Sequence, residues 1–231
     1  VEKPLCISEA ELDGIIIARD KAVAATGSAP AIVVGFNRRF APLARKMRDA
    51  MSSRSGPAFV IYTCNAGALP ADHWAHDPQV GGGRIIGEAC HFVDFIQYLT
   101  GSGITSVRAT RLRPQGRDPG DSAAITLGFG DGSVGQINYF SRGSRGYQKE
   151  RCEAAFDGKC LVLENFRQLK GYGIAAGGRS MRQDKGHDAQ FAEFQRLVAG
   201  QQQTTGFPVP FETVESVMRA TLRADQSMRE D

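Results

Sequence analysis

The 231-residue sequence has no run of about 20 consecutive apolar residues, so we expect no membrane-spanning helix and a soluble protein. It also has no block of basic residues: 28 Lys and Arg are spread along the chain against 25 Asp and Glu, and this excludes an evident nucleic-acid partner. Internal repeats and long low-complexity segments are absent, and the composition is close to the globular average. Disordered and fibrous classes are therefore excluded.

A cysteine framework is missing as well. The five cysteines are an odd number without a C-x-x-C pair, at positions 6, 64, 90, 152 and 160. We expect free, mostly buried thiols in a reducing cytoplasm, with no disulfides and no structural zinc. The sequence opens with Val1-Glu2-Lys3-Pro4-Leu5, which contains no Met and no charged stretch followed by an apolar one. We interpret this opening as a start inside a longer protein.

Nucleotide-binding glycine motifs are also absent. No G-x-G-x-x-G follows a first strand, and no G-x-x-x-x-G-K is present. The triple glycine at 81–83 precedes a predicted helix but follows no recognisable strand. The chain by itself is therefore expected to lack a pyrophosphate site.

The apolar patterns predict two parts that differ in secondary structure. The first 65 residues favour alternating strands and helices, in the order 1–5 (the end of a strand or the turn after it), 8–25 (helix opened by a Ser8 and Glu11 capping box), 31–36 (buried parallel strand), 42–51 (helix) and 58–63 (strand). The later part predicts strands at 105–112, 123–129, 133–140, 152–156 and 160–163, with tight turns at 130–132 and 157–159, and helices at 85–99, 190–198 and 211–228. The fold class predicted is α+β, a large mixed or antiparallel open sheet with helices on one face, preceded by an α/β segment.

The helix at 85–99 carries polar residues that suit acid–base chemistry. Glu88, His91 and Asp94 recur at steps of three, so they share one helix face or adjacent faces. A carboxylate beside a histidine can fix the imidazole tautomer and form a general acid–base unit. The alternative interpretation is a structural His91 with a solvated Glu88.

A second polar group surrounds the single tryptophan. His73, Trp74 and His76 lie in a turn-rich stretch that ends at Pro78. A zinc site would need two histidines one turn apart on a regular helix, so we predict no metal and favour contact with a sugar-like substrate. His187 is a further candidate in a loop, with Asp188 expected to cap the following helix.

Two more candidates follow predicted strands. Asn37 and Arg38 come directly after the strand 31–36, and Lys3 and Pro4 end the first strand. Ligands of open α/β sheets lie at the carboxyl ends of strands, where an Arg can hold a phosphate or carboxylate. Surface charge is the alternative interpretation for Arg38 and its neighbour Arg39.

Three segments together resemble the Gfo/Idh/MocA family, NAD(P)-dependent oxidoreductases of the glucose–fructose oxidoreductase and inositol dehydrogenase type. Glu2-Lys3-Pro4 resembles the family's E-K-P, residues 34–40 resemble its next strand, and residues 81–94 resemble G-G-G-x-x-x-D-x-G-x-H-x-x-D on its catalytic helix. The likeness covers essentially the whole chain. The nearest likeness is to the domain at the C-terminal end of bi-domain oxidoreductases.

The resemblance implies a domain division and a set of roles. Residues 1–36 would be the end of a dinucleotide-binding Rossmann domain, and residues 37–231 a substrate-binding and catalytic domain. The full-length protein would transfer hydride between NAD or NADP and a CH–OH group of a sugar, cyclitol or nucleotide-sugar, while this chain alone would be inactive. The implied catalytic residues are Lys3, His91, Glu88 and Asp94; the cofactor-binding residues are Lys3, Pro4, Asn37 and Arg38; the substrate-binding residues are His73, Trp74, His76 and His187. A homo-oligomer through the open sheet face is also implied.

The sequence departs from the family motif at two positions. Gly87 stands where the motif has its first Asp, and Ala89 where it has Gly. Glu88 is adjacent, but successive helical residues point about 100° apart, so Glu88 replaces the missing carboxylate only where the helix is irregular. The alternative is a non-catalytic ligand-binding or oligomerisation module of the same fold. Cofactor-assisted lyase or glycosidase chemistry on the same scaffold is a third possibility.

Overall fold

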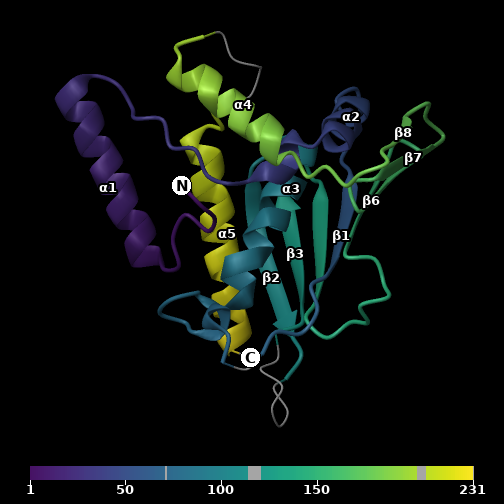
Figure 1. Ribbon diagram of the computed structural model, residues 1–231, viewed down its shortest axis with the longest axis horizontal. Helices are drawn as coiled ribbons and strands as arrows, with labels where there is room; N and C mark the ends of the chain where they lie inside the picture. The colour runs from purple at the N-terminus through teal and green to yellow at the C-terminus, as the bar shows by residue number, and fades with distance from the viewer. Residues whose placement is uncertain (71, 114–120, 202–206, 231) are drawn as a thin grey trace.

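The computed structural model describes residues 1–70, 72–113, 121–201 and 207–230, and an eight-stranded sheet is its centre (Figure 1). The strands are β1 (Phe59–Asn65), β2 (Ile104–Arg111), β3 (Ala123–Phe129), β4 (Val134–Phe140), β5 (Glu150–Phe156), β6 (Lys159–Glu164), β7 (Gln168–Tyr172) and β8 (Gly177–Arg179). The helices are α1 (Glu9–Thr26), α2 (Pro42–Met51), α3 (Cys90–Thr100), α4 (His187–Val198) and α5 (Phe211–Glu230). Short helical turns lie at Asn37–Phe40, Trp74–His76 and Ile85–Ala89.

The sheet is mixed, as predicted. Its order is β2-β3-β4-β1-β5-β6-β7-β8, and β1 runs parallel to β4 while the other neighbours are antiparallel. The two predicted hairpins join β3 to β4 and β5 to β6. Strands β7 and β8 were not predicted, because they are short and contain Gly171, Gly177 and Gly178, which have no side chain to show an alternating pattern.

Helices cover one face of the sheet. In Figure 1, α3 and α5 lie across the strands, and α5 packs along β2. The core between the layers is rich in aromatic side chains: the Tyr62 ring stacks on Phe92 at 4.6 Å between centroids, and Phe95 meets Tyr62 edge to face at 5.6 Å. Helix α1 stands apart from the sheet beside α5 and buries only Leu12. The Ser8 cap is confirmed, since its Oγ accepts the Glu11 N–H.

The predicted strand at 31–36 is wrong, because these residues lie outside the sheet. Residues 3–5 are bends, so of the two predictions for 1–5 the structure has the turn and not the strand end. Val1 and the 31–36 segment share two bonds, from the Val1 amino group to Val33 O and from Gly35 N–H to Val1 O. An apolar run becomes a strand only when a row of neighbouring backbone groups pairs with it, and the described residues supply no such row. Val34 and Phe36 are nevertheless buried, as the apolar pattern predicted.

The start of α4 also differs from the prediction. The residue before the helix is Gly186, in the left-handed region at φ 84°, and the helix begins at His187. Asp188 is therefore inside the first turn and does not cap the helix. No side chain caps α4; the Asp184 carboxylate accepts the Gly186 N–H at 2.8 Å in the turn that precedes the helix. None of the described helices is long and apolar enough to cross a membrane.

Candidate functional site

A cleft of about 480 Å³ opens at the edge of the sheet where the parallel strands β1 and β4 both end. Its walls come from the N-terminal segment, the loop after β1, the Trp74 turn, the triple-glycine run and the residue before β5. Four residues predicted from the sequence line it: Lys3, Pro4, Trp74 and Glu88. They are far apart in the chain, and the fold brings them together.

The triple glycine at 81–83 lets one wall of the cleft close. A Cβ on Gly81 would lie 2.7 Å from the Cα of Ala75, so only glycine allows the Trp74 turn to rest against this backbone. Gly82 and Gly83 have φ values of 69° and 84°, in the region that glycine adopts without strain. The glycine run is thus a packing element of the cleft wall.

The backbone that follows is a π-helical turn at Ile85–Ala89, which leads into α3. Such turns insert extra backbone into a helix, which changes the direction of the side chains on it. Both Gly87 and Glu88 line the cleft. The irregularity that Glu88 needs in order to take over a neighbouring carboxylate position is therefore present.

Two side chains hold the Glu88 carboxylate. The Tyr139 hydroxyl donates a hydrogen bond to Glu88 Oε2, and Arg84 Nη2 donates to the same oxygen at 3.3 Å. Arg84 also donates from Nη1 to Gly67 O at 2.6 Å, and its guanidinium lies 5.4 Å from the centre of the Tyr139 ring. Burial and the neighbouring Glu88 charge raise the pKa of Tyr139, so this phenol stays protonated and remains the donor.

Lys3 reaches the same turn from the N-terminal segment. Its Nζ donates to Gly87 O at 2.8 Å. The ammonium therefore meets the backbone carbonyl of the residue that has no side chain. No carboxylate forms an ion pair with Lys3 among the residues that the structure describes, so its positive charge remains available inside the cleft.

His91 lies three residues beyond Glu88, in the first turn of α3, and is 6% exposed. It does not line the cleft, and no hydrogen bond joins it to Glu88 among the described residues. Its Nδ1 is buried without a partner in this part of the chain. Burial lowers the pKa of His91 well below its usual value, and the nearby cations Arg38, Lys3 and Lys185 lower it further. The imidazole is therefore neutral near pH 7.

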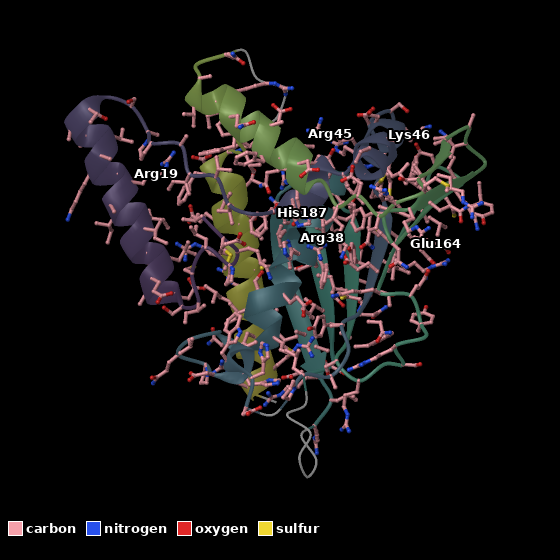
Figure 2. All side chains as sticks on the ribbon, in the orientation of Figure 1. Arg19, Arg38, Arg45, Lys46, Glu164 and His187 are labelled. Atoms are coloured by element: carbon pink, nitrogen blue, oxygen red, sulfur yellow. The ribbon has the colours of Figure 1, made fainter. Side chains whose placement is uncertain are left out.

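A buried charge network contains Arg38 and Lys185, two of the cations that lower the pKa of His91. Arg38 donates to Glu150 from Nε at 2.7 Å and from Nη2 at 3.2 Å, and the Tyr62 hydroxyl and Lys185 ammonium donate to the same carboxylate. Burial opposes ionisation of Glu150, but the two cations lower its pKa to about 2. The structure thus gives Arg38 a buried carboxylate partner in place of the cofactor group expected from the sequence. Arg38 and His187 are labelled near the start of α4 in Figure 2.

The predicted residues Asp94 and Asn37 are also used inside the protein. Asp94 is 1% exposed and forms a two-bond ion pair with Arg39. Burial raises the pKa of Asp94, and the Arg39 charge opposes that rise. The amide of Asn37 donates to Lys185 O at 2.8 Å, which ties the turn before α2 to the loop before α4. Neither residue lines the cleft.

The predicted substrate-binding residues separate into different places. Trp74 is 63% exposed and lines the cleft. His73 and His76 do not line the cleft. His73 accepts the Ala75 N–H through Nδ1 at 3.2 Å, and His76 lies 3.3 Å from Asp121. His187 lines a separate apolar groove of about 300 Å³ between the N-terminal segment and α4.

Comparison with known proteins shows which family and which proteins this chain is similar to. Residues 47–159 match the GFO/IDH/MocA C-terminal domain. Residues 47–159 belong to the Gfo/Idh/MocA family. The chain is also 29% identical over 159 residues to inositol 2-dehydrogenase 2 of Paenarthrobacter aurescens (strain TC1), an alignment that covers 66% of this chain and 45% of that protein.

Solved structures show that the whole chain has this fold. An NAD binding oxidoreductase from Klebsiella pneumoniae superimposes with a TM-score of 0.77 at 19% identity, covering 99% of this chain and 70% of that one. The UDP-N-acetylglucosamine 3-dehydrogenase of Acidithiobacillus ferrooxidans gives 0.73 at 19% identity, with 99% and 69% covered. The predicted α+β class is confirmed.

Sequence reasoning missed several residues of this candidate site. Arg84 and Lys149 line the cleft, and Tyr139 holds Glu88. Only Arg84 lies within the motif, at a position where the motif accepts any residue. Tyr139 and Lys149 flank the loop between β4 and β5. The available signal for Tyr139 was its place at a buried position near the end of a strand. A buried phenol needs a hydrogen-bond partner, so a polar group was to be expected beside it.

Proposed function

We propose that the protein containing this chain is an NAD(P)-dependent oxidoreductase that acts on a CH–OH group of a sugar, cyclitol or nucleotide-sugar. The observation that carries the proposal is the cleft in which Lys3 and Glu88 converge, next to a histidine held in its neutral form. The family membership of residues 47–159 supports it. Residues 1–36 are proposed as the end of the dinucleotide-binding domain, and residues 37–231 as the substrate domain.

The proposal divides the proton chemistry among Lys3 and Glu88, which line the cleft, and His91, which lies three residues beyond Glu88 and outside the lining. Neutral His91 can accept the proton of the reacting hydroxyl, as a general base must. The Lys3 ammonium stabilises the negative charge that develops on that oxygen, and it acts strongly because the site is partly closed to water. Glu88, fixed by Tyr139 and Arg84, can accept a hydrogen bond from a second hydroxyl and so orient the ring.

The chain's own residues fit one end of a nicotinamide cofactor. Lys3, Pro4 and the side-chain-free edge at Gly87 form a wall that a flat ring could approach closely. NAD(P), when bound, supplies the hydride acceptor or donor. Arg38 and Asn37 have internal partners, so we expect the phosphates to be held by residues outside these positions.

The proposal is tested by His91→Ala in the natural protein that contains this chain, with turnover followed at 340 nm over a panel of sugars and cyclitols. We expect a loss of 100-fold or more in kcat, about the contribution of a general base, with the folded state retained. His73→Ala is the matched control, because its Nδ1 accepts the Ala75 N–H within its own turn and the proposal gives this ring no part in proton transfer. Unchanged turnover in His91→Ala would reject the catalytic role and favour the non-catalytic binding module.

We also propose a homo-oligomer through the sheet face that carries no helices. One cross-strand row on that face is exposed and partly apolar: Phe59, Ala155, Cys160 and Tyr172 pair in register across four strands. Phe59 is 48% and Tyr172 57% exposed. Light scattering after size exclusion should give a dimer or larger assembly, and Phe59→Lys should shift it toward monomer. A monomer in the unmodified protein would refute the proposal.

A further inference from the structure

The cleft carries more positive than negative charge. Its lining contains three cations, Lys3, Arg84 and Lys149, and one carboxylate, Glu88. Arg84 is already neutralised by Glu88, its partner at i, i+4. Two positive charges, those of Lys3 and Lys149, are therefore left without a carboxylate partner among the described residues.

The backbone of Lys149 is fixed at the cleft wall. The Asn65 N–H at the end of β1 donates to Lys149 O at 2.7 Å, and the Asn65 side-chain amide donates to Ser144 O at 2.7 Å in the same loop. Gly143 packs against the Asn65 side chain. The backbone of the loop at 141–149 is therefore attached to β1, and this attachment places exposed Lys149 at the cleft wall.

The charges beside Lys149 do not neutralise it. The next residue, Glu150, is 1% exposed and is bound to Arg38 and Lys185 in the core. A further exposed cation, Arg145, lies in the same loop. The loop is thus basic, and its final cation is the one that lines the cleft.

Resting on the proposed function, we propose that the substrate carries an anionic group, a carboxylate or a phosphate, which Lys149 binds while the reacting hydroxyl lies near Lys3. An ammonium in a partly closed cleft forms charge-assisted hydrogen bonds to either anion, and these are stronger than bonds to a neutral hydroxyl. The field of the basic loop also attracts an anion during encounter. Sugar acids and sugar phosphates share this chemistry, and the experiment separates them.

The test measures binding to the chain by calorimetry with matched ligand sets: glucose, glucuronate and glucose 6-phosphate; galactose and galacturonate; myo-inositol and its monophosphate. In at least one set the anionic member should bind about tenfold more tightly than the neutral one, and less so at high salt. Lys149→Ala should remove that difference and leave the neutral ligand unchanged. Arg145→Ala is the matched control, because this exposed cation of the same loop does not line the cleft.

The outcomes separate this inference from the proposed function. Equal affinities within every set, or an anion preference that survives in Lys149→Ala, would overturn the inference whether or not turnover is found. A Lys149-dependent affinity for NADH alone would assign the cation to the cofactor and overturn it too. Anion binding that persists in His91→Ala, which loses turnover, would support both. Anion binding without any turnover would uphold this inference and reject the proposed activity.

Discussion

Replacing Asp94 by Asn removes one charge of a buried ion pair and separates two explanations of this residue. The sequence motif predicts a catalytic carboxylate, whereas the structure shows a side chain that is 1% exposed and bound through both oxygens to Arg39, whose side chain is 9% exposed. If Asp94 is structural, Asp94→Asn lowers the free energy of unfolding. If it is catalytic only, the variant keeps its stability and loses turnover.

The expected magnitude follows from burial. Removing one partner of a buried pair leaves the other charge uncompensated, a loss of about 3–5 kcal/mol. Native domains are stable by about 5–15 kcal/mol, so this is a large fraction of the total. An exposed pair contributes about 0–1 kcal/mol. Asp225 offers that control on α5, since it pairs with Arg229, whose side chain is 56% exposed.

The assay is urea unfolding of the chain, followed by circular dichroism, for Asp94→Asn, Asp225→Asn and the unmodified protein. We expect the Asp94 midpoint to fall strongly and the Asp225 midpoint to stay near the reference. The double variant Arg39→Met with Asp94→Leu should recover part of the loss, because no unpaired charge remains. An Asp94→Asn midpoint indistinguishable from that of Asp225→Asn would refute the structural role.

Further predictions concern the loss of stability in acid, through Glu150 and His91, and the effect of replacing Gly186. The folded-state pKa of Glu150, about 2, is below its ordinary value of 4.5, so its contribution to stability is present above pH 4.5 and is lost as the pH falls toward 2. The folded-state pKa of His91 is below 6.5, so below pH 6.5 the unfolded chain binds a proton that the folded chain does not bind. The free energy of unfolding then falls with pH by up to about 1.4 kcal/mol per pH unit. In His91→Phe the urea midpoint should depend less on pH over this range. An unchanged slope in His91→Phe would contradict this assignment. Gly186→Ala should destabilise strongly, because φ is 84° and a Cβ would lie 2.5 Å from Asn37 O; Gly27→Ala, at φ 74° with open space around it, should lose only about 1 kcal/mol in thermal unfolding. Equal losses in the two variants would show that the close approach is unimportant.

Local patterns predicted most of the sheet and the helices. Alternation identified strands such as Ala123–Phe129, the Gly-Asp-Gly and Asp-Gly-Lys turns located both hairpins, and Ser8 with Glu11 marked the start of α1. These features are determined by neighbouring residues, so a single sequence contains the information. The apolar run at 31–36 failed as a strand because strand formation depends on a partner that the run itself does not specify.

The site was predictable in its residue types and less so in its contacts. Lys3, Trp74 and Glu88 were identified from motif and chemistry, and they line one cleft. Their partners were not predictable, because the bonds are long-range: Tyr139 is 51 residues from Glu88, and Glu150 is 112 residues from Arg38. Helical spacing also assumed a regular helix, whereas the turn at 85–89 is π-helical.

The sequence by itself determined the fold class, the order of most elements and the residues able to do acid–base chemistry, because side-chain periodicity and turn preference act over a few residues. Only the tertiary structure decided which charged groups are free. It paired Asp94 with Arg39 and Arg38 with Glu150 in the core, and it left Lys3 and Lys149 in the cleft without carboxylate partners among the described residues. The reason is physical: a buried charge needs a partner at bonding distance, and the packed sheet and helices decide which charges meet.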